Sequence, residues 1–435
     1  MYKLTPVLAA AMLMVPFDAY ASAASDNNFS SRTKTVEDDP LTQKELTLDE
    51  AIRLAVSSDD PYLLEPGEQA AALEDRSVAD SQLADPKLRF NFANWPTNSF
   101  SYSQEPMTQV QLGISQAFPK GDTLKYRRAK RLVQAKGQRY KQSLRLREVI
   151  LDTRLNWLEL YYWSEAKNKV GESRQAVAEL IQIVAAIYAT GRETSQDILR
   201  AQLELSLLDD RLVEIERKSS VARAALARRI GTAAANRRLT KARPVVRHPS
   251  DIAVTRDLLN QHPAIQMFDA NVDAADKDVA IAAEQKKPGW SVNVGYGARG
   301  GDRADFASVG VVMDMPIFTG KRQDKQISAA KRLRQASRLS RDSVLLDLEK
   351  TLQTAFADWQ QLQNRVSLYQ SVVLKRAKET TEASLTSYQS GVTDFPELVR
   401  ARLAELDAEL KLLRLQADRL KAQSKLLFLE GEDDA

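Results

Sequence analysis

The sequence contains no cysteine and only two histidines, His248 and His262, among its 435 residues. A chain without thiols holds no disulfide, so its stability has to come from packing and assembly. Soft metal ligands are scarce, no ligand cluster appears, and no Ser-His-Asp, Cys-His or HExxH arrangement is present. We therefore predict no metal site and no cofactor, and we do not expect an enzyme.

The chain is also poor in the residues that make turns, with 16 Gly and 15 Pro against 28% charged residues. This composition is typical of a long, helical chain with few loops. Beyond the N-terminus no run approaches the roughly 18 apolar residues of a membrane helix, so a membrane span would have to consist of strands. The 62 basic and 58 acidic residues are too evenly spread to indicate a nucleic-acid partner.

A signal peptide is predicted over residues 1–23. It combines Lys3, an apolar run over 7–17 and the small-residue motif Ala21-Ser22-Ala23. Its removal would leave a polar lead over residues 24–45 at the start of the mature chain.

The rest of the sequence contains a tandem duplication. YATGRETSQDILRAQLE begins at Tyr188, and YQSGVTDFPELVRARLAE begins at Tyr388, 200 residues later (388 − 188). The same offset aligns Gly191 with Gly391 and Arg200 with Arg400. We therefore predict a first structural repeat over 46–231, a connecting segment over 232–261, a second repeat over 262–431 and a tail over 432–435.

Each repeat is predicted to begin with two helices and two strands. In the first repeat a helix opens at Thr47, a plausible N-cap, and another runs from Pro61 to about Ala84. Runs in which apolar and polar residues alternate predict the strands, at about 87–95, 108–118, 289–298 and 306–318. About ten residues per strand is the length that crosses a bilayer when tilted, although such strands also suit a soluble, half-buried sheet.

A long helix and a return helix are predicted to follow each pair of strands. The 66 residues of Thr123–Tyr188 and the 68 residues of Lys321–Tyr388 contain no proline, so each helix could extend about 100 Å. Apolar residues on heptads after each glycine predict antiparallel coiled-coil hairpins. The return helix 194–231 is shorter than its partner, so the helix before the strands is expected to stack end to end with it. This places the strands at one end, the glycine turns at the other, and 232–261 partway along.

Four strands alone cannot span a membrane, because an open sheet leaves edge N–H and C=O groups unpaired in hydrocarbon. The chain would therefore have to oligomerise to close a barrel. Even strand numbers of eight or twelve both satisfy this requirement, and the strands alone do not choose between them.

The motifs resemble those of the TolC family of outer-membrane efflux channels. The resemblance lies in the duplicated layout, in LTLDEAIRLAV, in ISQAFPKGDTLKYRRAKRL and MPIFTGKRQDKQISAAKRL, and in both tip motifs. It implies a mainly α fold with a transmembrane β-barrel: a homotrimer whose twelve-stranded barrel lies in the outer-membrane lipid of a Gram-negative bacterium. Long coiled-coil helices would form a twelve-helix periplasmic tunnel, which receives substrate from an inner-membrane pump through a periplasmic adaptor protein.

Asp197 and Glu397 are predicted to occupy equivalent places in the first turn of the return helices, where an acid complements the helix dipole. Alternatively, three copies of each would ring the periplasmic mouth and select cations. By resemblance, Asp197 and Tyr388 match positions that link neighbouring helix pairs in the closed state. Thr393 and Arg400 depart from the family pattern, which brings a salt-bridge gate into question.

The glycines at the two turns are predicted to be left-handed helix caps. By resemblance, the residues around them are candidates for contact with the adaptor: Gly191, Arg192, Glu193, Thr194, Gly391, Val392 and Asp394.

The leading hypothesis is a passive channel. An alternative is a structural periplasmic coiled-coil protein whose strands form a soluble cap. Aromatic residues at a membrane interface would argue against this alternative, and the candidates are Trp95, Trp290, Tyr296 and Phe318. A third hypothesis is a duct for type I protein secretion. The resemblance around ISQAFPKG favours cation or drug efflux and does not identify the exported substrate.

Overall fold

The computed structural model describes residues 45–188 and 195–431. The predicted signal peptide, the polar lead up to residue 44 and the tail 432–435 lie outside the described residues. No helix in the described ranges is long and apolar enough to cross a membrane.

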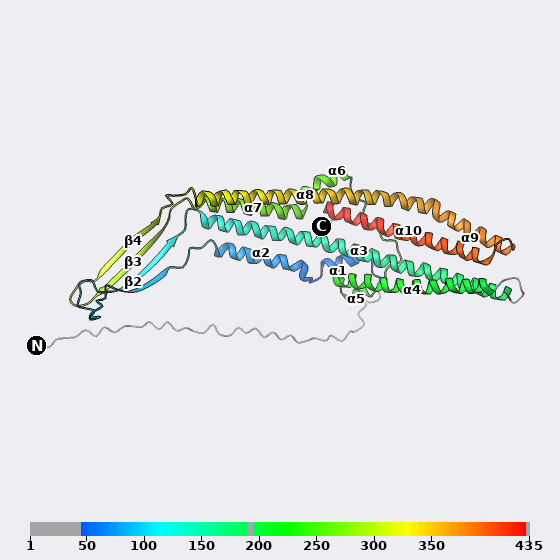
Figure 1. Ribbon diagram of the computed structural model, residues 1–435, viewed down its shortest axis with the longest axis horizontal. Coiled ribbons are helices and arrows are strands. Elements are labelled where there is room, and N and C mark those ends of the chain that lie inside the picture. Colours follow the sequence, from blue (N-terminus) through cyan, green and yellow to red (C-terminus); the bar gives the residue numbers. More distant parts are fainter. Residues whose placement is uncertain (1–44, 189–194, 432–435) are drawn as a thin grey trace. The chain divides into compact units, whose positions relative to one another are not determined.

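Both repeats have the same order of elements, and in the described ranges the helices run side by side with the sheet at one end (Figure 1). The first repeat consists of α1 (Leu48–Val56), α2 (Pro61–Ala79), β1 (Lys87–Ala93), β2 (Gln109–Phe118), α3 (Thr123–Tyr188) and α4 (Ser195–Ile230). The short α5 (Thr232–Ala235) follows. The second repeat consists of α6 (Ile252–Leu258), a 3-10 turn (Leu259–Gln261), α7 (Pro263–Glu284), β3 (Gly289–Arg299), β4 (Phe306–Asp314), α8 (Gln323–Leu368), a π-helical turn (Tyr369–Val373), α9 (Leu374–Gln389) and α10 (Phe395–Glu430).

Helix α3 has the bounds that the sequence predicts, whereas its counterpart in the second repeat is interrupted. The predicted helix over 321–388 begins at Gln323, and the π-helical turn divides it into α8 and α9. The return helices keep the offset of the duplication at both ends, since α4 and α10 begin 200 residues apart (395 − 195) and end 200 apart (430 − 230).

Several predicted bounds are wrong by a few residues, for local reasons. Helix α2 ends at Ala79 rather than Ala84, because Ser81 and Gln82 donate side-chain hydrogen bonds to the carbonyl of Val78 and Pro86 disfavours helix beyond them. Strand β1 ends at Ala93 because Asn94 has a φ of 55°, outside the extended region.

Helix α3 packs against α2 along its first part and against α4 along the rest. Ion pairs mark the first contact, running antiparallel from Arg131–Asp80 (2.7 Å) through Arg139–Glu74 (2.6 Å) to Arg145–Glu65 (2.6 Å). Farther along, Lys167 pairs with Glu216 and Arg174 with Asp209 (2.5 Å). The predicted end-to-end stacking of α2 and α4 on one long helix is therefore present.

The joint between α2 and α4 is a buried carboxylate. Asp60 caps α2 by accepting a hydrogen bond from the Tyr62 backbone N–H (3.0 Å). Both of its oxygens also accept bonds from Arg228 (2.9 and 3.0 Å), and Arg229 lies at 3.3 Å. The hydrogen bond from Arg228 is the main reason that the pKa of Asp60 lies below its ordinary value. Asp60 thus joins α2 to α4 through Arg228, which is 168 residues away in sequence.

Around this joint lies the largest apolar core of the chain. Trp157, Leu158 and Leu160 of α3 are fully buried there, together with Leu226 of α4 and Leu46. Leu46 also forms a parallel bridge to Leu239, which ties the start of the described chain to the segment after α5. The segment after α5 therefore lies partway along the helices.

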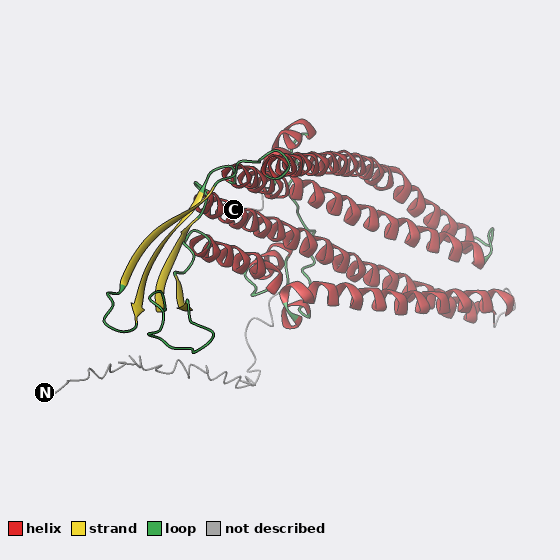
Figure 2. Ribbon diagram, turned by 60° about the vertical axis from the view of Figure 1, so that its left-hand side comes forward, coloured by secondary structure: helices red, strands yellow, loops and turns green. Residues whose placement is uncertain are grey.

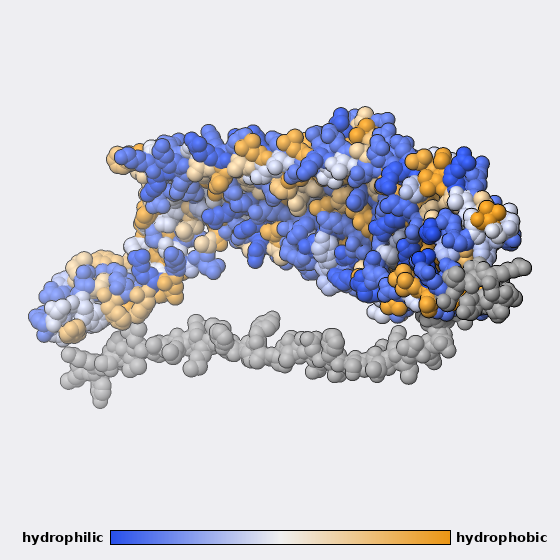
Figure 3. Space-filling model, turned by 45° about the vertical axis from the view of Figure 1, so that its right-hand side comes forward, coloured by the Kyte–Doolittle hydropathy of each residue, from blue (hydrophilic) through white to orange (hydrophobic). Residues whose placement is uncertain are grey.

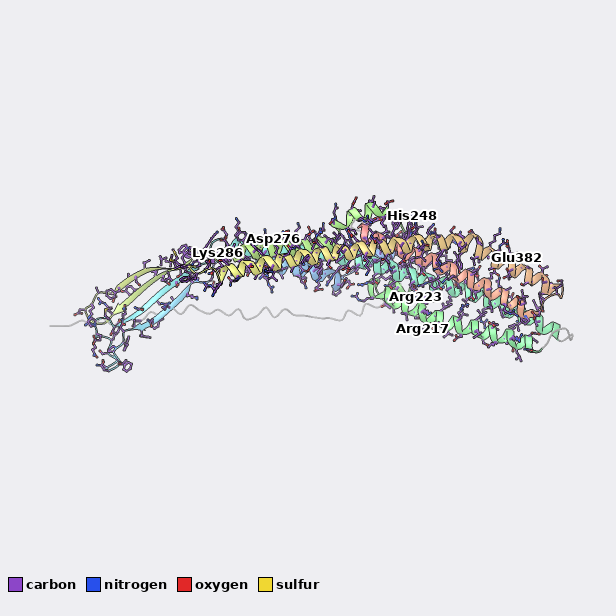
Figure 4. All side chains as sticks on the ribbon, turned by 45° about the horizontal axis from the view of Figure 1, so that its top comes forward. Arg217, Arg223, His248, Asp276, Lys286 and Glu382 are labelled. Carbon is purple, nitrogen blue, oxygen red and sulfur yellow. The ribbon has the colours of Figure 1, made fainter. Side chains whose placement is uncertain are left out.

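Helix α7 connects the sheet to both long helices. It lies between α3 and α8, with Lys130–Asp278 (2.7 Å) on one side and Arg334–Asp276 (3.0 Å) on the other. At its end Glu284 accepts a hydrogen bond from the Asp122 backbone (2.6 Å), just before α3. The next turn contributes Lys286, which pairs with Asp324 at the start of α8 (Figure 4). Both strand-to-helix junctions are thus held by the same helix end.

The four strands form one antiparallel sheet in the order β1-β2-β3-β4, and they leave the helices together (Figure 2). Its register places Leu88 opposite Ile114, Ile114 opposite Val294, and Val294 opposite Val309. Each β-strand therefore contributes alternate residues to the same two faces.

Replacing Asp60 with alanine is predicted to destabilise the joint between α2 and α4. The variant loses a helix cap and leaves Arg228 and Arg229 without their shared carboxylate, at a cost of about 2–4 kcal/mol. The apparent melting temperature of purified Asp60→Ala should fall below that of the wild type at pH 7. Because the folded pKa of Asp60 lies below its ordinary value of 3.8, the difference should be full above that value and shrink as the pH falls from it through the lower folded pKa.

Asp59→Ala is the matched control, since Asp59 is the exposed neighbour. Equal melting temperatures for the two variants would contradict the role given to Asp60.

Candidate functional site

One face of the sheet is apolar and exposed. The row Leu88, Ile114, Val294 and Val309 crosses all four strands, with exposed fractions of 71%, 54%, 52% and 77%. The other strand residues of this face are Phe90, Phe92, Val110, Leu112, Gln116, Phe118, Trp290, Val292, Tyr296, Ala298, Ala307, Val311 and Met313. Hydrophobic residues gather over the strands in Figure 3. A patch of this size on a monomer marks a surface that something apolar covers.

The opposite face is polar and rich in glycine. Lys87, Arg89 and Asn91 of β1 lie on it, and its middle consists of the glycines Gly113, Gly295, Gly297 and Gly310 with Ser115, Asn293 and Ser308. A hollow of about 510 Å³ lies over these residues, with Arg89 at its border. The alternation of apolar and polar faces is typical of strands with lipid on one side and water on the other.

The sheet also has two open edges. Strands β1 and β4 each pair with a neighbour on one side only, so the outer N–H and C=O groups of both strands have no sheet partner within the described chain. Unpaired strand edges favour pairing with another copy.

Aromatic residues lie at both ends of the apolar face. Phe118 stacks on Trp290 near the helices, with ring centroids 4.1 Å apart. At the far end, Trp95 stacks on Tyr102 (5.5 Å), and its indole nitrogen donates to the carbonyl of Phe100 (2.8 Å). Phe318, after β4, is 91% exposed. Two aromatic groups separated by a strand length are expected where a barrel meets the two surfaces of a bilayer.

At the opposite end of the helices, the turn between α9 and α10 is a capped corner. Gly391 has a φ of 73°, and its N–H bonds to the carbonyl of Tyr388 (3.0 Å), while the N–H of Val392 bonds to that of Ser387 (2.9 Å). These two bonds form a Schellman motif around a left-handed glycine, as predicted. Asp394, a predicted adaptor contact, accepts a bond from the Glu397 backbone (3.3 Å) and so caps α10.

The predicted acids at this tip lie beside arginines. Glu397 pairs with Arg400 at 2.6 Å, within the first turns of α10. Asp197 and Arg400 border the same hollow between α4 and α10, together with Arg200 and Glu204. The structure thus places as many basic as acidic residues around this hollow. The i, i+3 spacing of Glu397 and Arg400 is visible in the sequence, whereas the approach of α4 to α10 is not.

Tyr388 contributes to the apolar core of the tip. Its ring packs on Phe395 with centroids 5.8 Å apart. The same cluster contains Val184 of α3, Ala201 of α4 and Val399 of α10, all buried, so the two hairpins share one core near their tips.

Four predicted contact residues, Gly191, Arg192, Glu193 and Thr194, lie outside the described residues. Val392 is 78% exposed and lies at the outermost part of the second turn. Both histidines lie far along the chain from this turn: His248 packs edge-on to Trp359, and His262 caps α7 through Nδ1. Within the described ranges no three His, Asp or Glu side chains lie close enough together to hold a metal ion.

Comparison with known proteins finds a family match over part of the chain and a shared fold over most of it. Residues 254–432 match the family model "Outer membrane efflux protein". The outer membrane protein VceC from Vibrio cholerae has the same fold, with a TM-score of 0.74 at 17% identity over 88% of this chain and 96% of that one. The open-state MtrE outer membrane channel of Neisseria gonorrhoeae gives 0.71 at 15% identity, over 88% of each chain.

A membrane protein from Pseudomonas aeruginosa gives a TM-score of 0.77 at 15% identity, covering 88% of this chain and 92% of that one. No curated protein matches the sequence. Residues 254–432 thus match the outer membrane efflux protein family, and the chain shares its fold with these solved outer-membrane proteins.

Proposed function

We propose that three copies of this chain close a twelve-stranded barrel in the outer membrane and continue it as a periplasmic tunnel of helices. The observation that carries the proposal is the exposed sheet with one apolar face, one polar face and two open edges. Pairing β1 of one copy with β4 of the next satisfies every edge, covers the polar face with water and leaves the apolar face to lipid.

The dimensions of the strands support this assembly. The ten residues of β2 extend about 34 Å, which corresponds to a span of about 24 Å when the strand is tilted by about 45°. That span matches the apolar band of an outer-membrane barrel, and the two aromatic groups lie at its ends. The exposed apolar face argues against a soluble cap.

Such a duct would conduct passively. On the resemblance of its motifs, the energy would come from an inner-membrane pump through a periplasmic adaptor. The turn between α9 and α10 lies at the end of the described helices away from the sheet, and Gly391 and Val392, with residues 191–194, are the proposed adaptor contacts. Asp394 would act by fixing the turn rather than by touching the partner.

The channel is tested by the conductance of the purified mature protein in planar bilayers, after its oligomeric state in detergent has been measured. We expect a trimer with a small conductance, because the shared core holds the tips together. Asp197→Ala and Glu397→Ala should raise the conductance or change its selectivity if these acids line the mouth. A protein that stays soluble and monomeric without detergent would contradict the proposal.

Tyr388 is expected to hold the closed tip mainly through its ring. Tyr388→Ala removes the packing on Phe395 and should raise the conductance several-fold, whereas Tyr388→Phe keeps the ring and should raise it less. The same bilayer recordings compare both variants with the wild type. An unchanged conductance in Tyr388→Ala would remove Tyr388 from the gate.

A further inference from the structure

The polar face of the sheet is unbalanced in charge. Its strand residues include three basic side chains, Lys87, Arg89 and Arg299, and one acidic side chain, Asp314. Arg299 points into the loops, where it donates to the carbonyls of Ala304 and Pro106. The face therefore has a net charge of +2 in each copy (3 − 1), and +6 in a closed trimer.

Arg89 is the basic side chain that lies on the glycine-rich part of this face. The residues beside it on β2 and β3 are Gly113 and Gly295, so no side chain projects next to its guanidinium on this row until Ser308. Arg89 is exposed and makes no hydrogen bond or ion pair with any residue in the described ranges. It borders the hollow that the four glycines leave on this face.

No carboxylate of the same sheet can screen this charge. Asp314 lies three strands away, at about 4.8 Å per strand, and six residues farther along β4 than Ser308, which shares the row of Arg89. That separation exceeds the screening length of about 8 Å at physiological salt. Barrel closure would bring β4 of the neighbouring copy beside β1, which makes Asp314 the carboxylate to test together with Arg89.

The tip does not have an excess of basic side chains around its hollow. Its hollow is bordered by Asp197 and Glu204 against Arg200 and Arg400, so the charges balance there. If the chain forms the proposed channel, the barrel lumen therefore carries a positive fixed charge.

We infer that the barrel lumen selects for anionic solutes, and that Arg89 is the residue that determines this preference. The solutes would bear carboxylate, phosphate or sulfonate groups, which a guanidinium binds well. The inference rests on the proposed channel, and it argues against cations within the cation or drug efflux that the sequence resemblance favours. Rings of arginine or lysine select anions in other pores by raising the local concentration of negative ions.

The test is the reversal potential of the full-length mature trimer in a planar bilayer under a KCl gradient. The wild type should pass chloride in preference to potassium. Arg89→Gln should lower the chloride-to-potassium permeability ratio at least about twofold, since it removes half of the net charge of each copy's face. Asp314→Asn should raise the ratio.

Arg89→Lys is the matched control, because it keeps the charge and should keep the preference. If Arg89→Gln does not assemble, Lys87→Gln on the same face provides a second variant with the same expected direction. A wild-type channel that prefers cations, or an unchanged ratio in Arg89→Gln, would overturn this inference and leave the channel itself intact. The absence of any conductance from an assembled trimer would overturn the proposed channel and this inference with it.

Discussion

The structure depends on one requirement: backbone N–H and C=O groups that enter hydrocarbon must be paired. The sheet satisfies this requirement internally for β2 and β3 but leaves one edge of β1 and one edge of β4 open. The apolar row from Leu88 to Val309 shows which side of the sheet lipid would cover. In the proposed channel a single copy is therefore incomplete, and pairing with neighbouring copies completes the sheet.

In the helical part the main constraint is the length of α3, which needs packing partners along all of its 66 residues. No compact core can support a 66-residue helix, so α3 is covered in two pieces by α2 and α4. The end-to-end contact of these pieces is a weak point in any such arrangement, because two helix ends meet there with unsatisfied backbone groups. Asp60 and the arginines of α4 occupy that point, and the largest apolar core surrounds it.

Much of this fold could be predicted from the sequence, because periodicity and proline reveal long elements well. Alternation places Leu88 and Ile114 on one side and Arg89 on the other, and the absence of proline from 123 to 188 predicts α3. The end of α2 could not be predicted, since it depends on how the side chains of Ser81 and Gln82 bond to the last turn.

The candidate site was less predictable than the fold. The sequence identifies Asp197, Glu397 and Tyr388 as tip residues, but only the packing of α4 against α10 brings Asp197 to the hollow that Arg400 borders. The sequence alone does not single out Arg89, because its importance depends on its neighbours across the sheet, two glycines on other strands. The roles of the residues at 191–194 stay predictions.

The π-helical turn at Tyr369–Val373 gives the two repeats different mechanics. Nothing in YQSVV distinguishes these five residues from ordinary helix, as they include neither glycine nor proline. A wider turn has a weaker hydrogen-bond ladder than the helix on either side, so bending concentrates there. Helix α3 has no such point and distributes a load over its whole length. The two repeats of one duplicated sequence therefore differ in stiffness: α3 is a continuous long helix, whereas α8 and α9 are joined by a turn at which the helix bends more easily.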